Sequence, residues 1–297
     1  MTISIHIGIP RTASTFLQTK VFPNLLDVQY FNSRSREVDS VRKALKGYEL
    51  DSSEVSNVQR LRDKPGPSLL SAESLSMDPW TGNLLVDVSQ VRALLGPVQG
   101  VIFLRHPTDW VMSLYSLAVQ KNRFITINEF TGYDGSSINK SSPPEDRKRH
   151  VNLESIRFSK LISSWLRAAP QTKVFFFENF LQNKAKTLEQ LLTAIGSNHL
   201  PSEFELETRI NASSKIPSTD TAVRLFNILA GNPFAPRAIR SPRYRVASSM
   251  AQFAFSRSIS FKWTNQDESR ATIMSLLDEF FSCEVKEIKR LCSDCPW

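Results

Sequence analysis

Near its start the chain carries residues whose types and spacing suit the binding of a phosphate-like anion. The stretch HIGIPRTAST, residues 6–15, contains an apolar run that ends at Gly8. The frame G-x-x-x-x-G-K-[ST] of a phosphate-binding loop fits from Gly8 to Thr15, but Ala13 stands at its second glycine and Ser14 at its lysine. Because that lysine reaches the outer phosphates of a nucleoside triphosphate, its absence favours a smaller anionic group.

The same stretch offers several groups that can hold an anion. Loop N–H groups and the free N–H groups of a following helix would point toward the ligand, and the helix dipole adds to the attraction. Thr12, Ser14 and Thr15 bring hydroxyl groups, and Arg11 brings a cation. The structural alternative is a polar strand-to-helix turn capped by a serine or threonine.

A second stretch, VIFLRHPTDWVMSLYS, predicts another anion contact. Arg105 ends an apolar strand, where a Mg²⁺-dependent P-loop enzyme usually carries an aspartate. A guanidinium there suits an anion without a metal, because it can bind two oxygens at once. Pro107 fits the first turn of a helix, and Ser113 follows on that helix, so strand end and helix are expected to converge on one group. Taken alone, such an Arg and Ser are more often structural.

Short β-branched or aromatic runs alternate with longer helical stretches, which predicts a largely parallel sheet with helices on its faces. The predicted strands are residues 3–9, 68–73, 100–105 and 173–178. Apolar residues at helical spacing predict helices over 109–120, 158–168, 273–291 and from 15 to 26, where Pro23 should end the helix early. Two segments are predicted to be irregular, 131–150, which could form an acceptor-binding lid, and 231–249.

Composition sets wider limits on function. The 297 residues are 41% hydrophobic and carry a formal charge of +8, so the chain can bury a large core and suits an anionic ligand or surface. No block of five or six basic residues and no nucleic-acid motif occurs, so nucleic acid is not predicted as a partner. Without a secretory signal or a run of about 18 apolar residues, we expect a cytoplasmic protein with no integral membrane segment.

Three cysteines, Cys283, Cys292 and Cys295, lie among the last fifteen residues. An odd number in such a place does not make a disulfide framework. The CSDC motif lacks a second pair and nearby histidines, so ordinary thiols and no metal site are expected.

Together the two anion-binding stretches resemble the sulfotransferases that use 3′-phosphoadenosine 5′-phosphosulfate, PAPS. RTASTFL, residues 11–17, matches the family motif (K/R)-(T/S)-G-(S/T)-(S/T)-(F/W)-(L/I), which binds the 5′-phosphosulfate, with Ala13 at the glycine. The motif R-x-P-x-x-x-x-x-S-x-Y, which binds the 3′-phosphate, is matched with its spacing intact by Arg105, Pro107, Ser113 and Tyr115.

The likeness extends to the bacterial and Golgi carbohydrate-type branch of that family. IHIGIPRTASTFLQ is similar to its opening, LLSAESL to its second strand with a glutamate, residues 158–182 to its helix–Trp–strand passage and, more weakly, RINAS at 209–213 to a later stretch. The resemblance implies an α/β, P-loop-like three-layer fold with a central, mostly parallel sheet flanked by helices. It further implies one domain over 1–297, with a nucleotide-binding core of about 1–215 and a helical portion of about 216–297.

The implied activity moves a sulfuryl group from PAPS to a hydroxyl of a carbohydrate or glycolipid and leaves adenosine 3′,5′-bisphosphate, PAP, without a metal. Arg11 and the loop amides would stabilise charge on the leaving oxygen, since an arginine is not a proton donor. Glu73 is the predicted base for the acceptor. The implied nucleotide-binding residues are Arg11, Thr12, Ala13, Ser14, Thr15, Phe16, Arg105 and Ser113.

Several residues have competing interpretations. Glu73 could instead be a structural carboxylate at a helix N-terminus after Ser71. His106 and His150 are rival bases, whereas His6, inside the first strand, is expected to be buried and hydrogen-bonded. The remaining pair of candidates, Glu178 and Trp165, has no evident chemical role and is predicted to be structural.

Two other classes of function stay open. A nucleotide kinase or other P-loop NTPase would want a lysine at Ser14 and an acidic metal ligand at Arg105. A non-catalytic protein that binds adenosine phosphates or sulfated glycans fits if Ala13 disables the loop, because an alanine forced to positive φ costs about 1 kcal/mol. The basic segments 140–149 and 237–245 suit an anionic glycan or a membrane surface, while the acceptor and the oligomeric state are not predicted.

Overall fold

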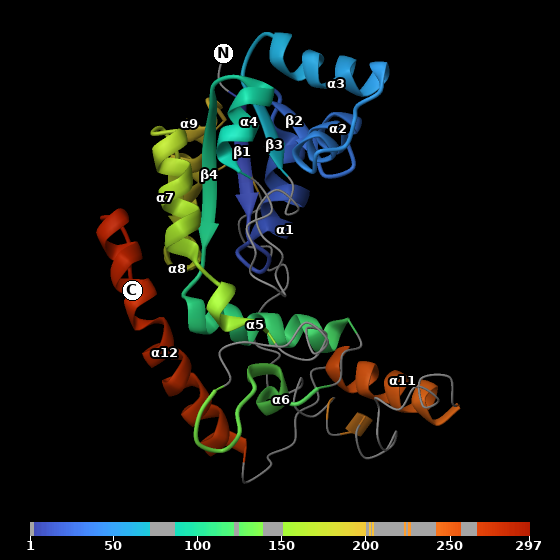
Figure 1. Cartoon of the computed structure of the whole chain (residues 1–297), viewed down its shortest axis with the longest axis vertical. Coiled ribbons are helices and arrows are strands. Elements are labelled where there is room, and N and C mark those ends of the chain that lie inside the picture. The colour runs from blue at the N-terminus through green and yellow to red at the C-terminus, as the bar shows by residue number, and fades with distance from the viewer. Residues whose placement is uncertain are drawn as a thin grey trace. The chain divides into compact units, whose positions relative to one another are not determined.

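The computed structural model describes residues 3–71, 87–121, 125–138, 151–199, 242–256 and 266–297, with the single residues 202, 204, 223, 225 and 226. The chain divides into two compact units, each taken by itself below (Figure 1). The first comprises Met1–His106, Ser155–Ile210 and Cys283–Trp297, and the second Pro107–Glu154 and Asn211–Ser282. The single domain expected from the sequence therefore stays a prediction.

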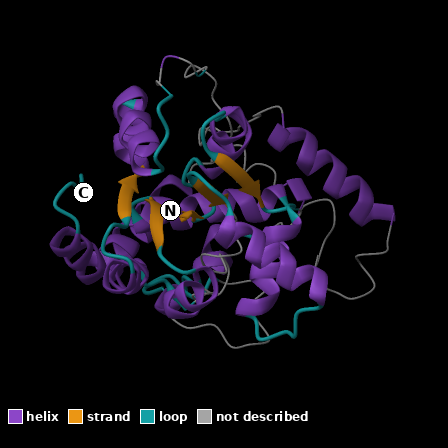
Figure 2. Cartoon of the chain, turned by 90° about the horizontal axis from the view of Figure 1, so that it is seen from above, coloured by secondary structure: helices purple, strands orange, loops and turns teal. Residues whose placement is uncertain are grey.

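Five strands of the first unit form one parallel sheet in the order β2-β3-β1-β4-β5. They are β1 (Ile3–Gly8), β2 (Gln29–Asn32), β3 (Ser68–Ser71), β4 (Val98–Leu104) and β5 (Lys173–Phe176). Every residue of β1, β3 and β4 is buried, as expected of parallel strands covered on both faces. Figure 2 shows these strands with helices on both sides, so the predicted P-loop-like, three-layer α/β fold is confirmed.

Alternation along the strands separates the two faces of the sheet. Leu69, Val101, Phe103 and Phe175 point to one face and form a core with the helices that follow β1 and with α8 (Phe177–Gln182) and α9 (Lys184–Ala194). On the other face Gly100 lets Trp165 of α7 (Phe158–Ala168) approach, because a Cβ at Gly100 would lie 2.7 Å from the indole ring. Packing against the sheet is therefore what Trp165 does in the structure.

Helices and turns of this unit are α1 (Ser14–Phe16), the π-helical η1 (Leu17–Val21), the 3₁₀ turn η2 (Phe22–Asn24), α2 (Arg36–Leu45), α3 (Ser52–Asp63), α4 (Val88–Leu95), α7 (Phe158–Ala168), α8 (Phe177–Gln182) and α9 (Lys184–Ala194). A further 3₁₀ turn, η5 (Leu153–Ser155), falls at the boundary of the units. The helix predicted over 158–168 matches α7, and the one predicted over 15–26 ends early at Asn24, after Pro23.

The second unit contains α5 (Pro107–Gln120), α6 (Ile127–Thr131), α11 (Pro242–Ser256) and the first part of α12 (Gln266–Leu291). Thr108 of α5 donates a hydrogen bond to Asp278 of α12 (2.5 Å), and Gln252 of α11 donates to the Val119 carbonyl (3.0 Å). The interpretation of 231–249 as irregular is wrong for residues 242–249, which are helical.

Candidate functional site

The two predicted anion contacts of the first unit emerge at one edge of the sheet. In the register of β1 and β4, Gly8 lies opposite Phe103, so the loop after Gly8 and Arg105 both follow carboxyl ends of neighbouring strands. The strand order also reverses around β1, with β3 on one side and β4 on the other. Ligands of parallel α/β sheets bind at such a switch point.

The backbone of the loop alternates in handedness. Arg11 (φ 72°) and Ala13 (φ 68°, ψ 3°) have left-handed conformations. They alternate with Pro10, whose ring holds φ near about −65°, and with Thr12, which is not in the positive-φ region. Alternation of this kind is typical of backbone nests, in which successive N–H groups can face one anion.

Ala13 occupies a position that favours glycine. The left-handed conformation costs an alanine about 1 kcal/mol, because its Cβ approaches the neighbouring carbonyl oxygen. Its side chain packs against the core formed by the helices after β1, which offsets part of that cost. Alanine at this position therefore lowers stability, as the sequence suggested, but the loop still adopts the left-handed conformation at Ala13.

Two of the loop hydroxyls brace the loop from inside. Thr12 Oγ1 and Ser14 Oγ donate to the carbonyl oxygen of Ile9 at 2.6 and 3.3 Å, and both side chains are buried. A Cβ at Gly8 would come within 2.5 Å of Ser14 Oγ. Ser14 therefore packs inside the loop, whereas Thr15 is exposed and its hydroxyl can face a ligand.

The helix after the loop begins without a side-chain cap. Its N-cap residue is Ala13, no side chain of the described residues caps it, and the first backbone bond runs from Leu17 N–H to the Ala13 carbonyl (3.1 Å). The amides of Ser14, Thr15 and Phe16 precede that bond, so they are the helix-end donors that an anion can accept. A turn capped by a serine or threonine is not what the structure has.

Arg105 is held by an aromatic ring next to it in space. Its guanidinium lies 4.9 Å from the centre of the Phe177 ring, a cation–π contact. The residue after it, His106, donates its backbone N–H to Glu178 Oε1 (2.9 Å), and Glu178 Oε2 accepts from the indole N–H of Trp297 (2.8 Å). The structural role expected for Glu178 is thus to fix the turn that carries Arg105.

The ring of His106 is part of the same packing. It lies edge-on to Trp297 with 5.3 Å between ring centres, and Phe176 contacts the same indole at 5.0 Å. Sequence reasoning did not include Trp297, because 191 positions separate it from His106 and no motif marks it. A proton-transfer role for His106 stays a prediction.

A buried polar cluster joins β1, β2, β3 and η1 beneath the loop. Ser71 Oγ lies 2.7 Å from His6 Nδ1, accepts from Gln18 Nε2 at 2.9 Å and is hydrogen-bonded to Tyr30. His6 is buried and hydrogen-bonded, as the sequence led us to expect. Full burial lowers its pKa to about 3, so its ring is neutral. Burial raises the pKa of Tyr30 to about 12.

The cluster reaches the end of β3, the strand that precedes the predicted base in the sequence. Ser71 ends β3, two positions before Glu73. Glu73 and His150 themselves lie outside the described residues, as do 139–150 and RINAS. Ser113, predicted to bind the 3′-phosphate, is buried on α5 of the second unit, as is Tyr115, and its role stays a prediction.

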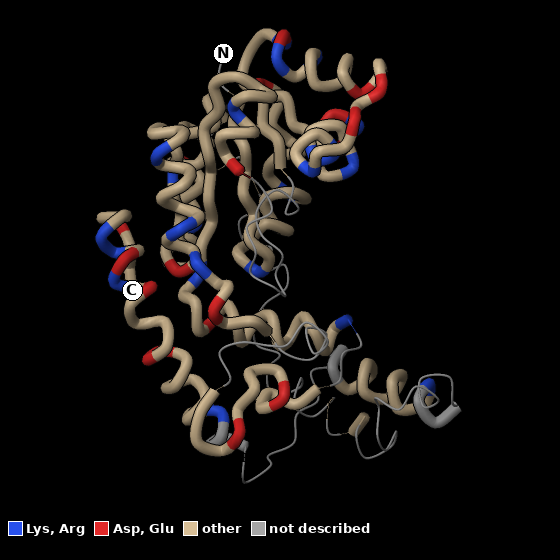
Figure 3. The backbone as a smooth tube through the Cα atoms, viewed as in Figure 1, with Lys and Arg blue, Asp and Glu red and all other residues tan. Residues whose placement is uncertain are grey.

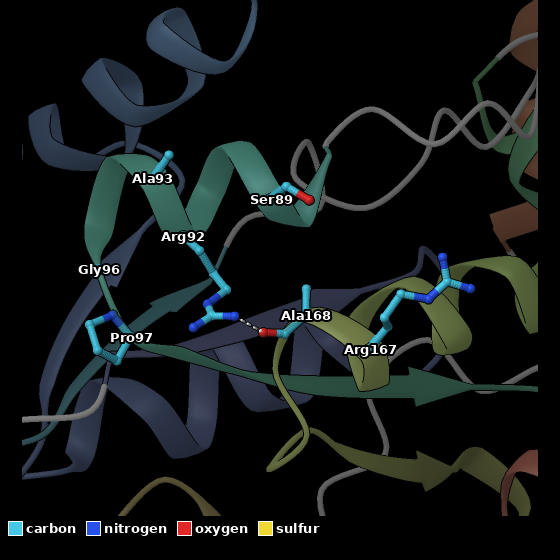
Figure 4. A pocket seen from close by; sticks show the side chains of 7 residues that line it. All are labelled: Ser89, Arg92, Ala93, Gly96, Pro97, Arg167 and Ala168. Carbon is cyan, nitrogen blue, oxygen red and sulfur yellow. Dashed lines mark hydrogen bonds between the residues drawn. The ribbon is translucent and has the colours of Figure 1, made fainter.

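A separate cavity of about 550 Å³ lies at the opposite end of β4 (Figure 4). Gly96 and Pro97, just before that strand, line it, and Arg92 donates to the Ala168 carbonyl across it (2.5 Å). The guanidinium of Arg167 points away from Arg92 in the view. Because the two cations do not converge and the loop is at the other edge, this cavity is not the anion site.

Within the described residues no group of His, Cys, Asp and Glu is arranged to hold a metal ion, and no helix is long and apolar enough to cross a membrane. Cys283, Cys292 and Cys295 are free thiols. Burial raises the pKa of Cys292 to about 11. Burial also raises the pKa of Cys295 above its ordinary value.

No family model and no curated protein matches the sequence. Among solved structures, the chain is similar to a sulfotransferase from Alicyclobacillus acidocaldarius (TM-score 0.48, 11% identity, 83% of this chain and 95% of that one). It is also similar to mouse sulfotransferase SULT7A1 complexed with PAP, with a TM-score of 0.36 and 12% identity over 98% of this chain and 85% of that one. A sulfotransferase domain from the curacin biosynthetic pathway matches with a TM-score of 0.36 and 14% identity over 84% of this chain and 96% of that one. At these TM-scores the roles of single residues rest on the chain's own geometry.

Proposed function

We propose that the chain transfers a sulfuryl group from PAPS to an acceptor hydroxyl, with the loop after β1 holding the 5′-phosphosulfate. The observation that carries the proposal is the left-handed backbone at Arg11 and Ala13 directly before an uncapped helix start. Such a loop presents amides to an anion, and Ser14 stands where the sites of nucleoside triphosphates carry a lysine.

Arg105 supports a donor with a second anionic group. It follows the strand next to β1, where an Mg²⁺-dependent enzyme would place a carboxylate. A guanidinium at this position repels a divalent cation and binds phosphate oxygens in pairs. We assign it to the 3′-phosphate of PAPS.

The chemistry proposed for the site is alignment and charge stabilisation. As the sulfuryl group leaves, negative charge grows on the oxygen that stays with the 5′-phosphate, and in this proposal Arg11 and the loop amides stabilise it. The proton of the acceptor hydroxyl passes to Glu73 in this proposal, which rests on the sequence alone.

A saccharide or glycolipid is the acceptor class that we propose. The resemblance of IHIGIPRTASTFLQ and LLSAESL to the carbohydrate-type branch supports it. Transfer of radiolabelled sulfate from PAPS to a panel of glycan and lipid extracts, followed by identification of the product, tests it directly. Label that appears only in proteins or small metabolites would rule out this acceptor class.

Thermal melting with PAP, adenosine 5′-phosphosulfate or Mg-ATP tests the donor. We expect PAP to raise the melting temperature most, because it carries both the 5′-phosphate and the 3′-phosphate that the proposed site binds. A ligand at about 100 times its Kd adds about 2.7 kcal/mol of stability. Stabilisation by Mg-ATP alone would favour a kinase. Stabilisation by PAP without any sulfate transfer would favour a non-catalytic binding protein.

Arg105→Ala sharpens the same experiment. The variant should bind PAP about 10- to 100-fold more weakly, because a charge-assisted contact to the 3′-phosphate is lost. Its affinity for adenosine 5′-phosphosulfate should stay nearly unchanged. Arg62→Ala, at an exposed arginine of α3, is the matched control. Equal weakening of both nucleotides would show that Arg105 does not contact the 3′-phosphate.

A further inference from the structure

Helix α11 of the second unit has two apolar faces of different kinds. One consists of Ala247, Ala251 and Ala254, which are almost fully buried. The other lies one residue earlier, at Val246, Met250 and Phe253, whose side chains are 57%, 47% and 57% exposed. Both sets follow i, i+4, i+7 spacing, so each forms a continuous stripe along the helix.

The exposed stripe differs from the other exposed apolar residues of the described chain. These residues lie singly, Leu26 and Tyr48 in separate loops and Val55 and Leu181 on separate helices, which is ordinary for a protein surface. Three large exposed side chains in line on one helix form instead a patch, and patches of this kind mark surfaces that meet a partner or a membrane. We call Val246, Met250 and Phe253 the α11 stripe.

The sequence that contains and flanks α11 is basic, which suits an anionic partner. Residues 221–266 contain seven Lys and Arg and no Asp or Glu. Since the whole chain has 37 basic and 29 acidic residues, 30 against 29 remain outside this segment, which therefore carries nearly all of the net charge of +8. Figure 3 shows no acidic residue along the part of α11 that is described, and Arg245 is exposed next to the stripe.

We propose that the α11 stripe docks on a membrane surface rich in anionic lipid. An interfacial helix combines an apolar stripe, which enters the boundary between headgroups and acyl chains, with arginines that remain at the headgroups. Each cation near an anionic leaflet strengthens binding, and Arg245 is exposed next to the stripe. The docking is peripheral and does not depend on the proposed sulfuryl transfer.

Two other occupants fit less well. A sulfated or carboxylated glycan would satisfy the arginines but offers no apolar layer for Met250 and Phe253. A second copy of the chain would bring two segments of the same positive charge together, which repel each other at low ionic strength.

Flotation of the full chain with lipid vesicles tests the proposal. We expect binding to vesicles with about one-third phosphatidylglycerol in phosphatidylcholine and weak binding to phosphatidylcholine alone, since anionic headgroups supply the attraction. Binding should fall steeply as the salt concentration approaches about 1 M, where charges are screened within about 3 Å.

Two pairs of variants separate the stripe from general surface changes. Val246→Ser with Met250→Ser and Phe253→Ser should reduce vesicle binding by about tenfold or more, because the inserted apolar area is lost. Leu26→Ser with Val55→Ser and Leu181→Ser changes the same number of exposed apolar residues elsewhere and should leave binding unchanged. Arg245→Gln should cost about fivefold, and Arg62→Gln, also at an exposed arginine, should cost little.

The remaining outcomes decide against the proposal. Equal binding by the stripe variant and the wild type, or no vesicle binding at all, overturns it. Retention on a sulfated polysaccharide without vesicle binding would assign the surface to a glycan. A dimer in light scattering that the stripe variant dissociates, again without vesicle binding, would assign it to self-association. Circular dichroism and melting temperature show whether each variant is folded.

Discussion

Glu178 accepts the backbone N–H of His106 with one carboxylate oxygen, and by this bond it fixes the turn that directly follows Arg105. Its second oxygen accepts the indole N–H of Trp297. The three residues come from three distant parts of the chain and meet at the carboxyl edge of the sheet. We infer that they position Arg105 and do not themselves touch the nucleotide.

Trp297→Phe tests this positioning role. The variant keeps an aromatic ring against His106 and Phe176 but removes the N–H that binds Glu178. We expect PAP to bind about three- to tenfold more weakly, because a hydrogen bond to a charged group is worth about 1.5–3 kcal/mol and part of its loss is transmitted to Arg105.

The measurement is titration calorimetry with PAP and with adenosine 5′-phosphosulfate, which lacks the 3′-phosphate. Trp165→Phe is the control, since this ring packs on Gly100 inside the unit and should lower the melting temperature without changing the ratio of the two affinities. If Trp297→Phe also leaves that ratio unchanged, Trp297 is structural only.

Ala13→Gly should stabilise the protein. A glycine adopts the left-handed conformation of this position without the Cβ penalty, so we expect the free energy of unfolding to rise by up to about 1 kcal/mol. Ala93→Gly, at an exposed position inside α4, should lower it by about 0.5–1 kcal/mol, because a glycine destabilises a right-handed helix.

Urea unfolding of both variants measures whether the free energy of unfolding rises or falls in each. A destabilised Ala13→Gly protein would mean that the packing of the Ala13 methyl group outweighs its backbone strain. PAP affinity of the same variant then reports on the loop, and we expect it to be equal to or tighter than that of the wild type.

Acid should destabilise the fold through His6. Its folded-state pKa, about 3, is depressed from 6.5, so the unfolded chain binds a proton that the folded chain refuses. The contribution to stability is therefore complete above about pH 6.5 and is lost as the pH falls toward about 3, at up to about 1.4 kcal/mol per pH unit.

Urea unfolding between about pH 7 and pH 4 measures this slope. The His6→Gln variant keeps a polar side chain near Ser71 but cannot take up the proton, so its stability should fall less steeply by that amount. Carboxylates contribute to the slope in both proteins and cancel in the comparison. Identical slopes would show that His6 is not the residue that titrates.

Local patterns in the sequence were enough to predict part of the fold and site. Apolar runs marked β1 and β4, and strand ends followed by polar residues placed the loop and Arg105 at one edge. Strand β2 was missed, because its four residues, QYFN, offer no clear apolar alternation. Helix α11 and its exposed stripe were also not predicted, because the prolines and arginines before it indicated an irregular segment.

Contacts between distant residues could not be predicted. His6 and Ser71 are 65 positions apart, and Glu178 and Trp297 are 119 apart, so no spacing rule connects them. The sequence raised the left-handed conformation of Ala13 only as a possibility, because positive φ is expected of a glycine and not of an alanine. The site therefore divides into a loop that the sequence predicts and supports that only the fold brings together.

Glu73→Gln separates the proposed base from its structural alternative. As a base, Glu73 takes the proton of the acceptor hydroxyl, so the variant should lose about 10²- to 10⁴-fold in kcat and keep its affinity for PAP. As a carboxylate at a helix N-terminus, it should instead lower the melting temperature by a few degrees and leave kcat nearly intact. Glu189→Gln, at an exposed glutamate of α9, removes the same charge without either effect. An unchanged kcat would remove Glu73 from the mechanism and make His106 and His150 the next bases to test.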